Sequence, residues 1–249
     1  CDQQILSLGG ILWYGGVNPY GLLISINERI PKMRKTKRIV SVGILLLTAF
    51  AVWTFLIQTV DVQQIGPRQS VVGFATINGW FHRLTNVHWM LYTLTDWLGL
   101  VPIVVCLLFA CVGLAQLVQR RSLLKVDLDI LLLGVYYVLV IFAYLLFEMI
   151  PLNYRPVLIE GILEASYPSS TTLLVLSVMP TLHFQAEQRL KNSALRHCIK
   201  VLTVLFSVFM VVGRLLSGVH WLTDIVGAIF LSGGLFLLYK ASVLRFCKE

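Results

Sequence analysis

Six apolar stretches along the chain are each about as long as a helix that crosses a membrane. They lie at residues 39–60, 99–118, 129–147, 169–184, 199–216 and 220–239. A bilayer core of about 30 Å requires about 20 mostly apolar residues in helical conformation. The fourth stretch is the shortest and contains Pro180, which predicts either a kink or an extension of the helix toward Glu187. The pattern predicts an all-α fold, built as a bundle of six transmembrane helices.

The composition indicates a membrane protein and excludes a water-soluble one. Apolar residues make up 57% of the 249 residues and charged residues only 13%, and the mean hydropathy is +0.82. Such a chain has too few polar side chains to cover a soluble domain of this size. A transporter or channel would be expected to carry charged residues at mid-depth in its spans, and these stretches carry almost none.

The basic residues indicate the orientation of the chain in the membrane. One set of span ends has Lys32, Arg34, Lys35, Lys37, Arg38, Arg120, Arg121, Lys125, Arg189, Lys191, Arg196, Lys200, Lys240, Arg245 and Lys248, and the other set has Arg68, Arg83, Arg155 and Arg214. Because short cytoplasmic loops are rich in Lys and Arg, we expect a multi-pass cell-membrane protein with both termini in the cytoplasm. The net charge of +8 then reflects this orientation and contact with anionic lipid headgroups, and no nucleic-acid partner is expected.

Residues 1–32 are expected to lie outside the membrane domain. They contain no apolar run of spanning length, and the chain opens on Cys1, whereas Met33 and the basic run after it have the character of a true start. We interpret residues 1–32 either as a non-native leader of translated upstream sequence or as a disordered cytoplasmic extension. Residues 33–249 then form one domain. Its first span is interpreted as a retained helix, because it lacks the small-residue cleavage site of a signal peptide.

The segment at residues 71–97 is rich in aromatic side chains, including Trp80, Trp89 and Trp97. Aromatic residues gather at the membrane–water interface, so we predict an outer helical segment that lies in that interface. His82 and His88 are six residues apart, which is not a helical metal-ligand spacing, and the five cysteines lie in spans, near cytoplasmic ends or in the leader. No metal site and no disulfide is therefore predicted.

Three polar islands lie on the predicted outer side: Tyr154-Arg155-Pro156, residues 166–172, and residues 214–224. In the third island, Asp224 follows His220 by one helical turn, close enough to orient the imidazole by hydrogen bonding. A carboxylate at one ring nitrogen fixes the tautomer and stabilises the imidazolium, so the other nitrogen keeps its lone pair for attack on phosphorus. Arg214 would hold phosphate oxygens. We therefore predict phosphate transfer through a phosphohistidine, with His220 and Asp224 as the catalytic residues.

The second island predicts an anion-binding helix start. Pro168 suits the first turn of a helix, and hydroxyl residues suit its cap. Those residues are Ser169, Ser170 and Thr171. Helix starts bind anions through unpaired backbone N–H groups and the helix dipole, and the fourth and sixth predicted helices both begin on the outer side. An ordinary helix cap is the alternative for this island alone. Together with Arg155 and Arg214, it predicts one phosphate pocket.

These islands resemble the three signature motifs of the type 2 phosphatidic acid phosphatase superfamily, whose fold is related to that of vanadium haloperoxidases. Arg214, His220 and Asp224 match motif three, Arg155-Pro156 matches part of motif one, and Pro168-Ser169 matches part of motif two. The resemblance covers the six-helix layout from about Met33 to the C-terminus. It implies a nucleophilic His220 supported by Asp224, and phosphate binding by Arg155, Arg214 and Ser169. It also implies chemistry that needs no metal or other cofactor.

Two positions depart from the family pattern. Motif one usually has a lysine seven residues before its arginine, where this chain has Glu148, and motif two usually continues with Gly-His, where this chain has Ser170-Thr171. Glu148 would repel phosphate unless it turns away, pairs with Arg155 or is held protonated by burial. The missing histidine is the family's general acid, and such a loss costs a factor of roughly 10² to 10⁴. An alkoxide leaving group needs a proton more than a lipid monophosphate leaving group does. This departure therefore favours a diphosphate substrate or a weakened enzyme.

The sequence thus predicts an integral membrane lipid phosphatase with its site on the outer face. The expected substrate is a polyprenyl diphosphate such as the undecaprenyl carrier, or a phosphatidate-type lipid, and the other expected partners are membrane lipids. The alternative is a non-catalytic lipid-phosphate-binding protein of the same fold, which Glu148 and Thr171 favour. Glu160 and Glu164 are either substitute acids or ordinary solvent-facing carboxylates.

Overall fold

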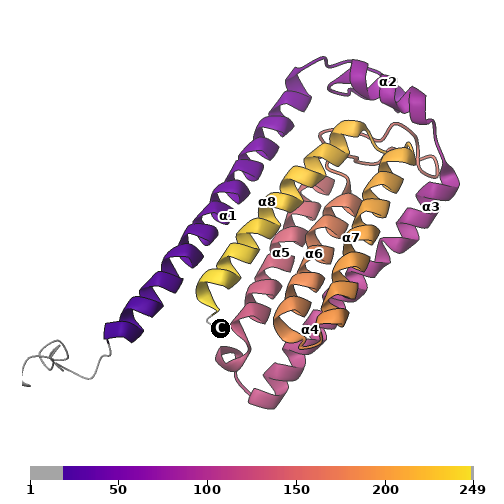
Figure 1. The fold of residues 1–249 in the computed structure, drawn as a ribbon. Coiled ribbons are helices and arrows are strands. Elements are labelled where there is room, and N and C mark those ends of the chain that lie inside the picture. Colours follow the sequence, from indigo (N-terminus) through magenta and orange to yellow (C-terminus); the bar gives the residue numbers. More distant parts are fainter. Residues whose placement is uncertain (1–18, 248–249) are drawn as a thin grey trace, which may run out of the picture.

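Long helices lying side by side make up most of the molecule (Figure 1). The structure is a computed structural model that describes the backbone of residues 19–247 and the side chains of residues 33–247. In chain order the elements are α1 (Pro19–Thr59), η1 (Pro67–Gln69), α2 (Ala75–Thr85), α3 (Trp89–Leu98), α4 (Leu100–Arg120), η2 (Leu123–Lys125), α5 (Leu128–Met149), α6 (Ser170–Arg189), α7 (Ser193–Leu216) and α8 (Leu222–Phe246). Within the proposed leader, residues 1–18 lie outside the described residues, and residues 19–32 are helical backbone continuous with α1.

Within the described residues, five helical segments are long and apolar enough to cross a membrane. They are Met33–Thr59, Trp89–Arg120, Leu128–Met149, Ser193–Leu216 and Leu222–Phe246. The prediction of an all-α, multi-pass membrane protein is therefore confirmed. The count of six spans is not confirmed, because α6 is not among these segments. α7 also begins earlier than predicted, so that Arg196 and Lys200 lie on its first turns.

α6 differs in composition because it packs among other helices. It contacts α4, α5, α7 and α8, and several of its polar groups have partners on these neighbours. The Tyr136 hydroxyl donates to the Ser177 carbonyl at 2.9 Å, and the Gln185 amide donates to the Tyr239 hydroxyl at 2.8 Å. A helix surrounded by protein can carry such groups, because its neighbours satisfy them where lipid cannot. The helix continues through Pro180 to Arg189, which confirms the predicted extension.

α1 packs at the edge of the bundle against α8, and most of its surface remains exposed (Figure 1). Two glycines allow the close approach. A Cβ atom on Gly234 would lie 2.7 Å from the Leu47 side chain, and one on Gly43 would lie 3.3 Å from the Gly234 carbonyl. Small residues at helix–helix contacts let backbones approach in membranes, where packing drives association.

The outer segment divides into two helices with different positions. α2 lies across one end of the bundle (Figure 1) and is amphipathic: Ile77, Trp80 and Leu84 are exposed, whereas Asn78 is buried against α8. α3 continues into α4 and belongs to the span Trp89–Arg120. The predicted span at residues 99–118 was therefore too short, because the aromatic residues of α3 are apolar enough to extend it.

Candidate functional site

The loop between α5 and α6 folds back on itself and brings the first two islands together. Tyr154 and Ala165 form an antiparallel bridge. The Arg155 backbone N–H donates to the Glu164 carbonyl at 3.0 Å, and the Ser166 N–H donates to the Asn153 carbonyl at 2.9 Å. This hairpin-like loop fixes Arg155 beside the residues that lead into α6.

The turn between α7 and α8 carries the third island. Gly218 has a φ of +71°, and a Cβ atom there would lie 2.0 Å from the Asn86 carbonyl oxygen, so only glycine fits. The His88 N–H donates to the Ser217 carbonyl at 3.0 Å. The Trp221 indole donates to the Tyr154 carbonyl at 2.7 Å, which joins this turn to the α5–α6 loop. His220 is therefore held from both sides by loops at one end of the bundle.

His220 and Asp224 lie together in the interior, with 3% and 0% of their surfaces exposed. His220 Nδ1 lies 3.5 Å from Asp224 Oδ2, and the Ser166 backbone is also a hydrogen-bond partner of the ring. The same carboxylate oxygen accepts the Trp221 backbone N–H at 2.9 Å. Because the Asp224 carboxylate faces Nδ1, we assign the proton to that nitrogen and the lone pair to Nε2.

Arg214 occupies the other side of the imidazole. Its Nη2 lies 3.5 Å from His220 Nε2, and its Nη1 lies 3.5 Å from Asp96. The guanidinium carbon lies 5.1 Å from the centre of the Tyr92 ring, a cation–π contact. Within the described residues, Arg214 Nε is buried without a hydrogen-bond partner. A buried donor of this kind suits an oxyanion, because leaving it unpaired costs about 1–3 kcal/mol.

Arg155 is also buried, and it is close enough to affect the charge of His220. Its Nε lies 3.0 Å from Glu164 Oε2, and within residues 33–247 its buried Nη1 has no hydrogen-bond partner. The two arginines thus bring two positive charges and unpaired donors to the same imidazole. Glu164 neutralises part of that charge, and a bound phosphate would compete with it for Arg155.

The charge state of His220 follows from these surroundings. Burial lowers the pKa of His220 well below its ordinary value of 6.5, and the charges of Arg155 and Arg214 lower it further. The imidazole is therefore neutral at pH 7. A neutral ring with its lone pair on the side of Arg214 has the form that nucleophilic attack on phosphorus requires.

The residues of the second island differ from one another in their surroundings. Ser169 is fully buried, its backbone N–H donates to the Asp224 carbonyl at 3.2 Å, and its hydroxyl donates to Thr172 Oγ1 at 3.1 Å. The start of α6 is thereby attached to the start of α8. The Thr171 methyl group faces Gly99, where a Cβ atom would lie 3.4 Å away. Of the predicted phosphate-binding groups, Arg155, Arg214 and Ser169 thus surround His220 and Asp224, whereas Thr171 is directed toward the α3–α4 junction.

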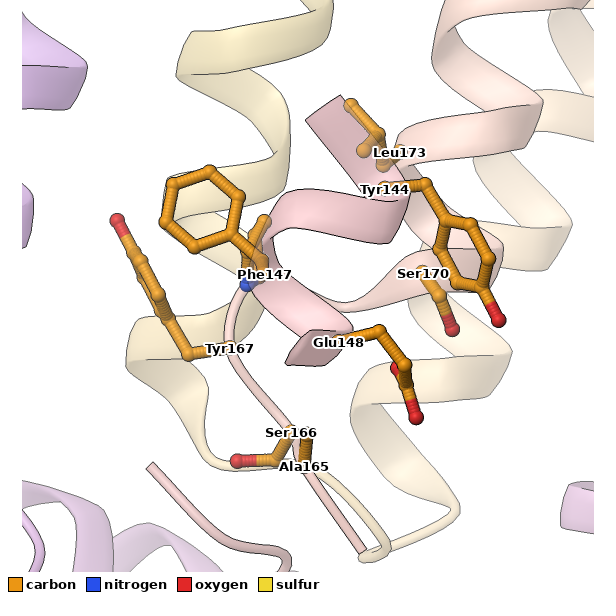
Figure 2. A pocket seen from close by; sticks show the side chains of 9 residues that line it. Tyr144, Phe147, Glu148, Ala165, Ser166, Tyr167, Ser170 and Leu173 are labelled. Carbon is orange, nitrogen blue, oxygen red and sulfur yellow. The ribbon is translucent and has the colours of Figure 1, made fainter. Parts of the chain in front are cut away.

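Ser170 lines a small pocket with Glu148 and Tyr144, next to the buried site. Figure 2 shows the Glu148 carboxylate on the same side as the Ser170 and Tyr144 hydroxyls, while the Ser166 hydroxyl points the other way. Glu148 is exposed. The ion-pair partner of Arg155 is Glu164. Among the described residues Glu148 therefore does not pair with Arg155, and its carboxylate lies with the Ser170 and Tyr144 hydroxyls.

Sequence reasoning missed several residues that complete the site. Asp96 pairs with Arg214, and the side chains of Asn153 and Ser166 lie beside the Asp224 carboxyl group. One signal was present for Asp96, because it is the single acidic residue between Asp61 and Asp127. Asn153 directly precedes the first island, but nothing in its local pattern indicates contact with Asp224.

Comparison with known proteins supports this interpretation of the fold. A sequence model of the PAP2 superfamily matches residues 131–246. The fold is similar to a solved structure described as the first transmembrane PAP2 type phosphatidylglycerolphosphate phosphatase from Bacillus subtilis, with 15% identity and a TM-score of 0.61, over 83% of this chain and 98% of that chain. No curated protein matches this chain significantly. The residues that this sequence model matches, 131–246, include every residue predicted for the site.

Proposed function

We propose that this protein is a membrane lipid phosphatase that acts through a phosphohistidine on His220. The PAP2 domain and the transmembrane fold support a phosphatase of membrane lipids in general. The observation that carries the finer proposal is the asymmetry of the imidazole. Its Nδ1 faces Asp224 and its Nε2 faces Arg214, each at 3.5 Å.

The chemistry follows from this geometry without a metal. Arg155 and Arg214 bind the phosphate oxygens, and His220 Nε2 attacks phosphorus. A P–N bond forms, the P–O bond to the leaving group breaks, and Asp224 stabilises the imidazolium through Nδ1–H. Water then attacks the phosphohistidine, which releases phosphate and returns the neutral imidazole. No step requires a proton from motif two when the leaving group is itself a stable anion.

The substrate is proposed to be a lipid diphosphate, or a lipid monophosphate at lower rate. Thr171 stands where the family's general acid is expected, so the leaving group must depart without a proton from that position. Hydrolysis of a lipid diphosphate releases a lipid monophosphate, which is a more stable anion than the alkoxide released from a lipid monophosphate substrate. Candidate substrates are polyprenyl diphosphates and phosphatidate-type lipids. The similar Bacillus subtilis protein is described as a phosphatidylglycerolphosphate phosphatase, so diacyl monophosphates also need testing. We place the site on the outer membrane face, because most basic residues flank the opposite span ends.

A non-catalytic lipid-phosphate binder is the second candidate. One observation favours it: Glu164 lies 3.0 Å from Arg155 and already neutralises part of the phosphate site. The retained His220, Asp224 and Arg214 favour catalysis, because a site used only for binding does not need an oriented nucleophile.

The test is phosphate release by purified protein from a panel of lipid mono- and diphosphates. The wild-type protein is expected to release phosphate, and His220→Ala is expected to reduce release to background. His197→Ala, an exposed histidine on the first turns of α7, is the matched control and should keep full activity. Turnover that survives in His220→Ala would remove His220 from the mechanism. Binding of lipid phosphates by the wild-type protein without any release would support the non-catalytic candidate.

A further inference from the structure

Both arginines of the candidate site already have a carboxylate partner. Arg155 Nε lies 3.0 Å from Glu164 Oε2, and Arg214 Nη1 lies 3.5 Å from Asp96 Oδ1. The partners come from different segments, since Glu164 belongs to the α5–α6 loop and Asp96 belongs to α3. Each guanidinium is matched by one carboxylate, so the two pairs are neutral together. A phosphate that enters the site meets both carboxylates as well as both arginines.

The two ion pairs belong to one site. The charges of all four groups act on the Tyr92 hydroxyl, and the Tyr92 ring lies 5.1 Å from the guanidinium carbon of Arg214. Arg155 is close enough to affect the charge of Arg214, and both arginines affect the charge of His220. One phosphate at His220 therefore competes with both carboxylates for the arginines.

The members of each pair differ in their exposure to water. The side chains of Arg155 and Arg214 are 9% and 1% exposed, whereas those of Glu164 and Asp96 are 35% and 57% exposed. A carboxylate that already contacts water gives up an ion pair at little cost. A buried guanidinium without any partner is much less favourable. When phosphate binds, we therefore expect the carboxylates to move and the arginines to stay.

The carboxylates leave part of each guanidinium unused. Within residues 33–247, Arg155 Nη1 and Arg214 Nε are buried without a hydrogen-bond partner. Phosphate has more acceptor oxygens than a carboxylate and is able to use these donors, so it displaces the carboxylates. Without the carboxylates, departure of the product phosphate would leave two buried positive charges unpaired. That cost would hold the product in the site.

We propose that Glu164 and Asp96 set the phosphate affinity of the site and promote release of the product. Each carboxylate holds its arginine while the site is empty, gives way to phosphate, and returns as phosphate leaves. The proposal rests on the proposed function and adds two residues that act through Arg155 and Arg214. In this role Glu164 accepts hydrogen bonds from Arg155 and transfers no proton, so it is not a substitute acid.

Inhibition of the purified full-length protein by inorganic phosphate tests this role. Glu164→Gln and Asp96→Asn keep the shape of each side chain and remove its charge. Glu164→Gln is expected to lower the inhibition constant of phosphate about tenfold. Asp96→Asn should lower it about threefold, because its ion pair is longer and more exposed. Both variants should lower KM without raising kcat, since they strengthen binding of the phosphate group in general.

Glu160→Gln is the matched control. It removes the same charge from an exposed position of the same loop and should leave the inhibition constant unchanged. Structural damage would weaken phosphate binding, so it does not explain a lower inhibition constant. An unchanged or higher constant in either test variant overturns the role of that carboxylate. A loss of kcat/KM in Glu164→Gln would instead identify Glu164 as an acid or base.

Phosphate binding to the His220→Ala protein provides a second arm that needs no turnover. Inorganic phosphate that binds the folded protein raises its Tm in detergent, with sodium chloride at equal ionic strength as the reference. Adding Glu164→Gln should lower the phosphate concentration required for a given rise about tenfold. Equal concentrations, or no rise in either protein, overturn the proposal. If the wild-type protein releases no phosphate from any lipid, the proposed function fails, whereas this shift still reports on Glu164.

Discussion

The imidazole of His220 has different neighbours on its two nitrogen atoms, and its reactivity depends on that difference. The Asp224 carboxylate lies at Nδ1, and the Arg214 guanidinium lies at Nε2. An acceptor at one nitrogen and a donor at the other favour a single neutral tautomer. Burial and two positive charges keep the ring in that form.

The first prediction concerns the protonation of His220. Its folded-state pKa lies well below the unfolded value near 6.5, so the imidazole is expected to protonate only well below pH 6.5. The unfolded chain binds the proton first, so the stability from this group is complete above about pH 6.5 and is lost as pH falls toward the folded pKa. Hydrogen–deuterium exchange at the imidazole C2, followed by mass spectrometry across pH, measures the midpoint.

Arg155→Ala is the control for this measurement. It removes a positive charge that lowers the pKa of His220, so the midpoint should move up toward 6.5. A wild-type midpoint at or above 6.5 would show that His220 is neither buried nor opposed by the arginines as described.

The second prediction concerns position 171. A histidine there would restore an acid next to the α3–α4 junction, which carries the Asp96 partner of Arg214. Thr171→His is expected to raise turnover of lipid monophosphates by roughly 10²-fold or more and to change diphosphate turnover much less. Thr171→Phe has similar bulk and no proton, and it should give no gain. If Thr171→His raised the turnover of neither substrate, or of both substrates equally, the hypothesis of a lost general acid would be wrong.

At the scale of elements, the start of α8 is held by helices far away in the sequence. The Asn78 amide of α2 donates to Thr223 Oγ1 at 3.0 Å, and its oxygen accepts the Thr223 N–H at 3.3 Å. The Trp53 indole of α1 donates to the Thr223 carbonyl at 3.1 Å. Since Asp224 is the next residue, these contacts position the carboxylate that orients His220.

The third prediction is that Asn78→Ala destabilises the protein by about 1–3 kcal/mol, because it leaves buried backbone groups unpaired. Phosphate release should fall as well, through a less well-held Asp224. Thermal unfolding in detergent and the release assay measure the two effects. Arg83→Ala, an exposed change on the same helix, should affect neither. An unchanged melting temperature in Asn78→Ala would show that α2 does not support α8.

The sequence predicted helices well and contacts between distant segments poorly. Apolar runs report local burial in lipid, so α5 and α8 were placed within a few residues at their outer ends. The spacing within the third island also predicted that Arg214, His220 and Asp224 lie together, and the structure brings them together. The Arg155–Glu164 pair depends on how the α5–α6 loop folds back, and the contact of Asp96 with Arg214 depends on how α3 packs against α7. Neither contact can be predicted from the spacing of residues within one helix.

At the scale of the whole molecule, the two ends of the bundle differ in chemistry. The candidate site lies at the end covered by α2 (Figure 1). At the other end, ion pairs connect the ends of α4 and α6 to the residue before α5. Arg120 lies 2.7 Å from Asp127, and Arg189 lies 3.3 Å from Asp127. These partly exposed pairs each contribute little stability. The basic residues at that end are the reason for the proposal that it faces the cytoplasm.

The fourth prediction follows from this asymmetry. In a cysteine-free background, Glu160→Cys at the loop near the site should react with a membrane-impermeant maleimide in intact cells. Arg121→Cys, which follows α4 at the opposite end, should react only after the membrane is permeabilised. The reverse pattern would place the site in the cytoplasm and exclude an outer-face substrate.

Detection of the covalent intermediate tests the nucleophilic role of His220 most directly. Purified protein is mixed with a lipid diphosphate, quenched within the first turnover at alkaline pH, and digested for peptide mass spectrometry. We expect an acid-labile phosphoryl group on the peptide that contains His220, and none in His220→Ala or before substrate is added. Steady phosphate release without any phosphoryl group on His220 would exclude a phosphohistidine at this residue.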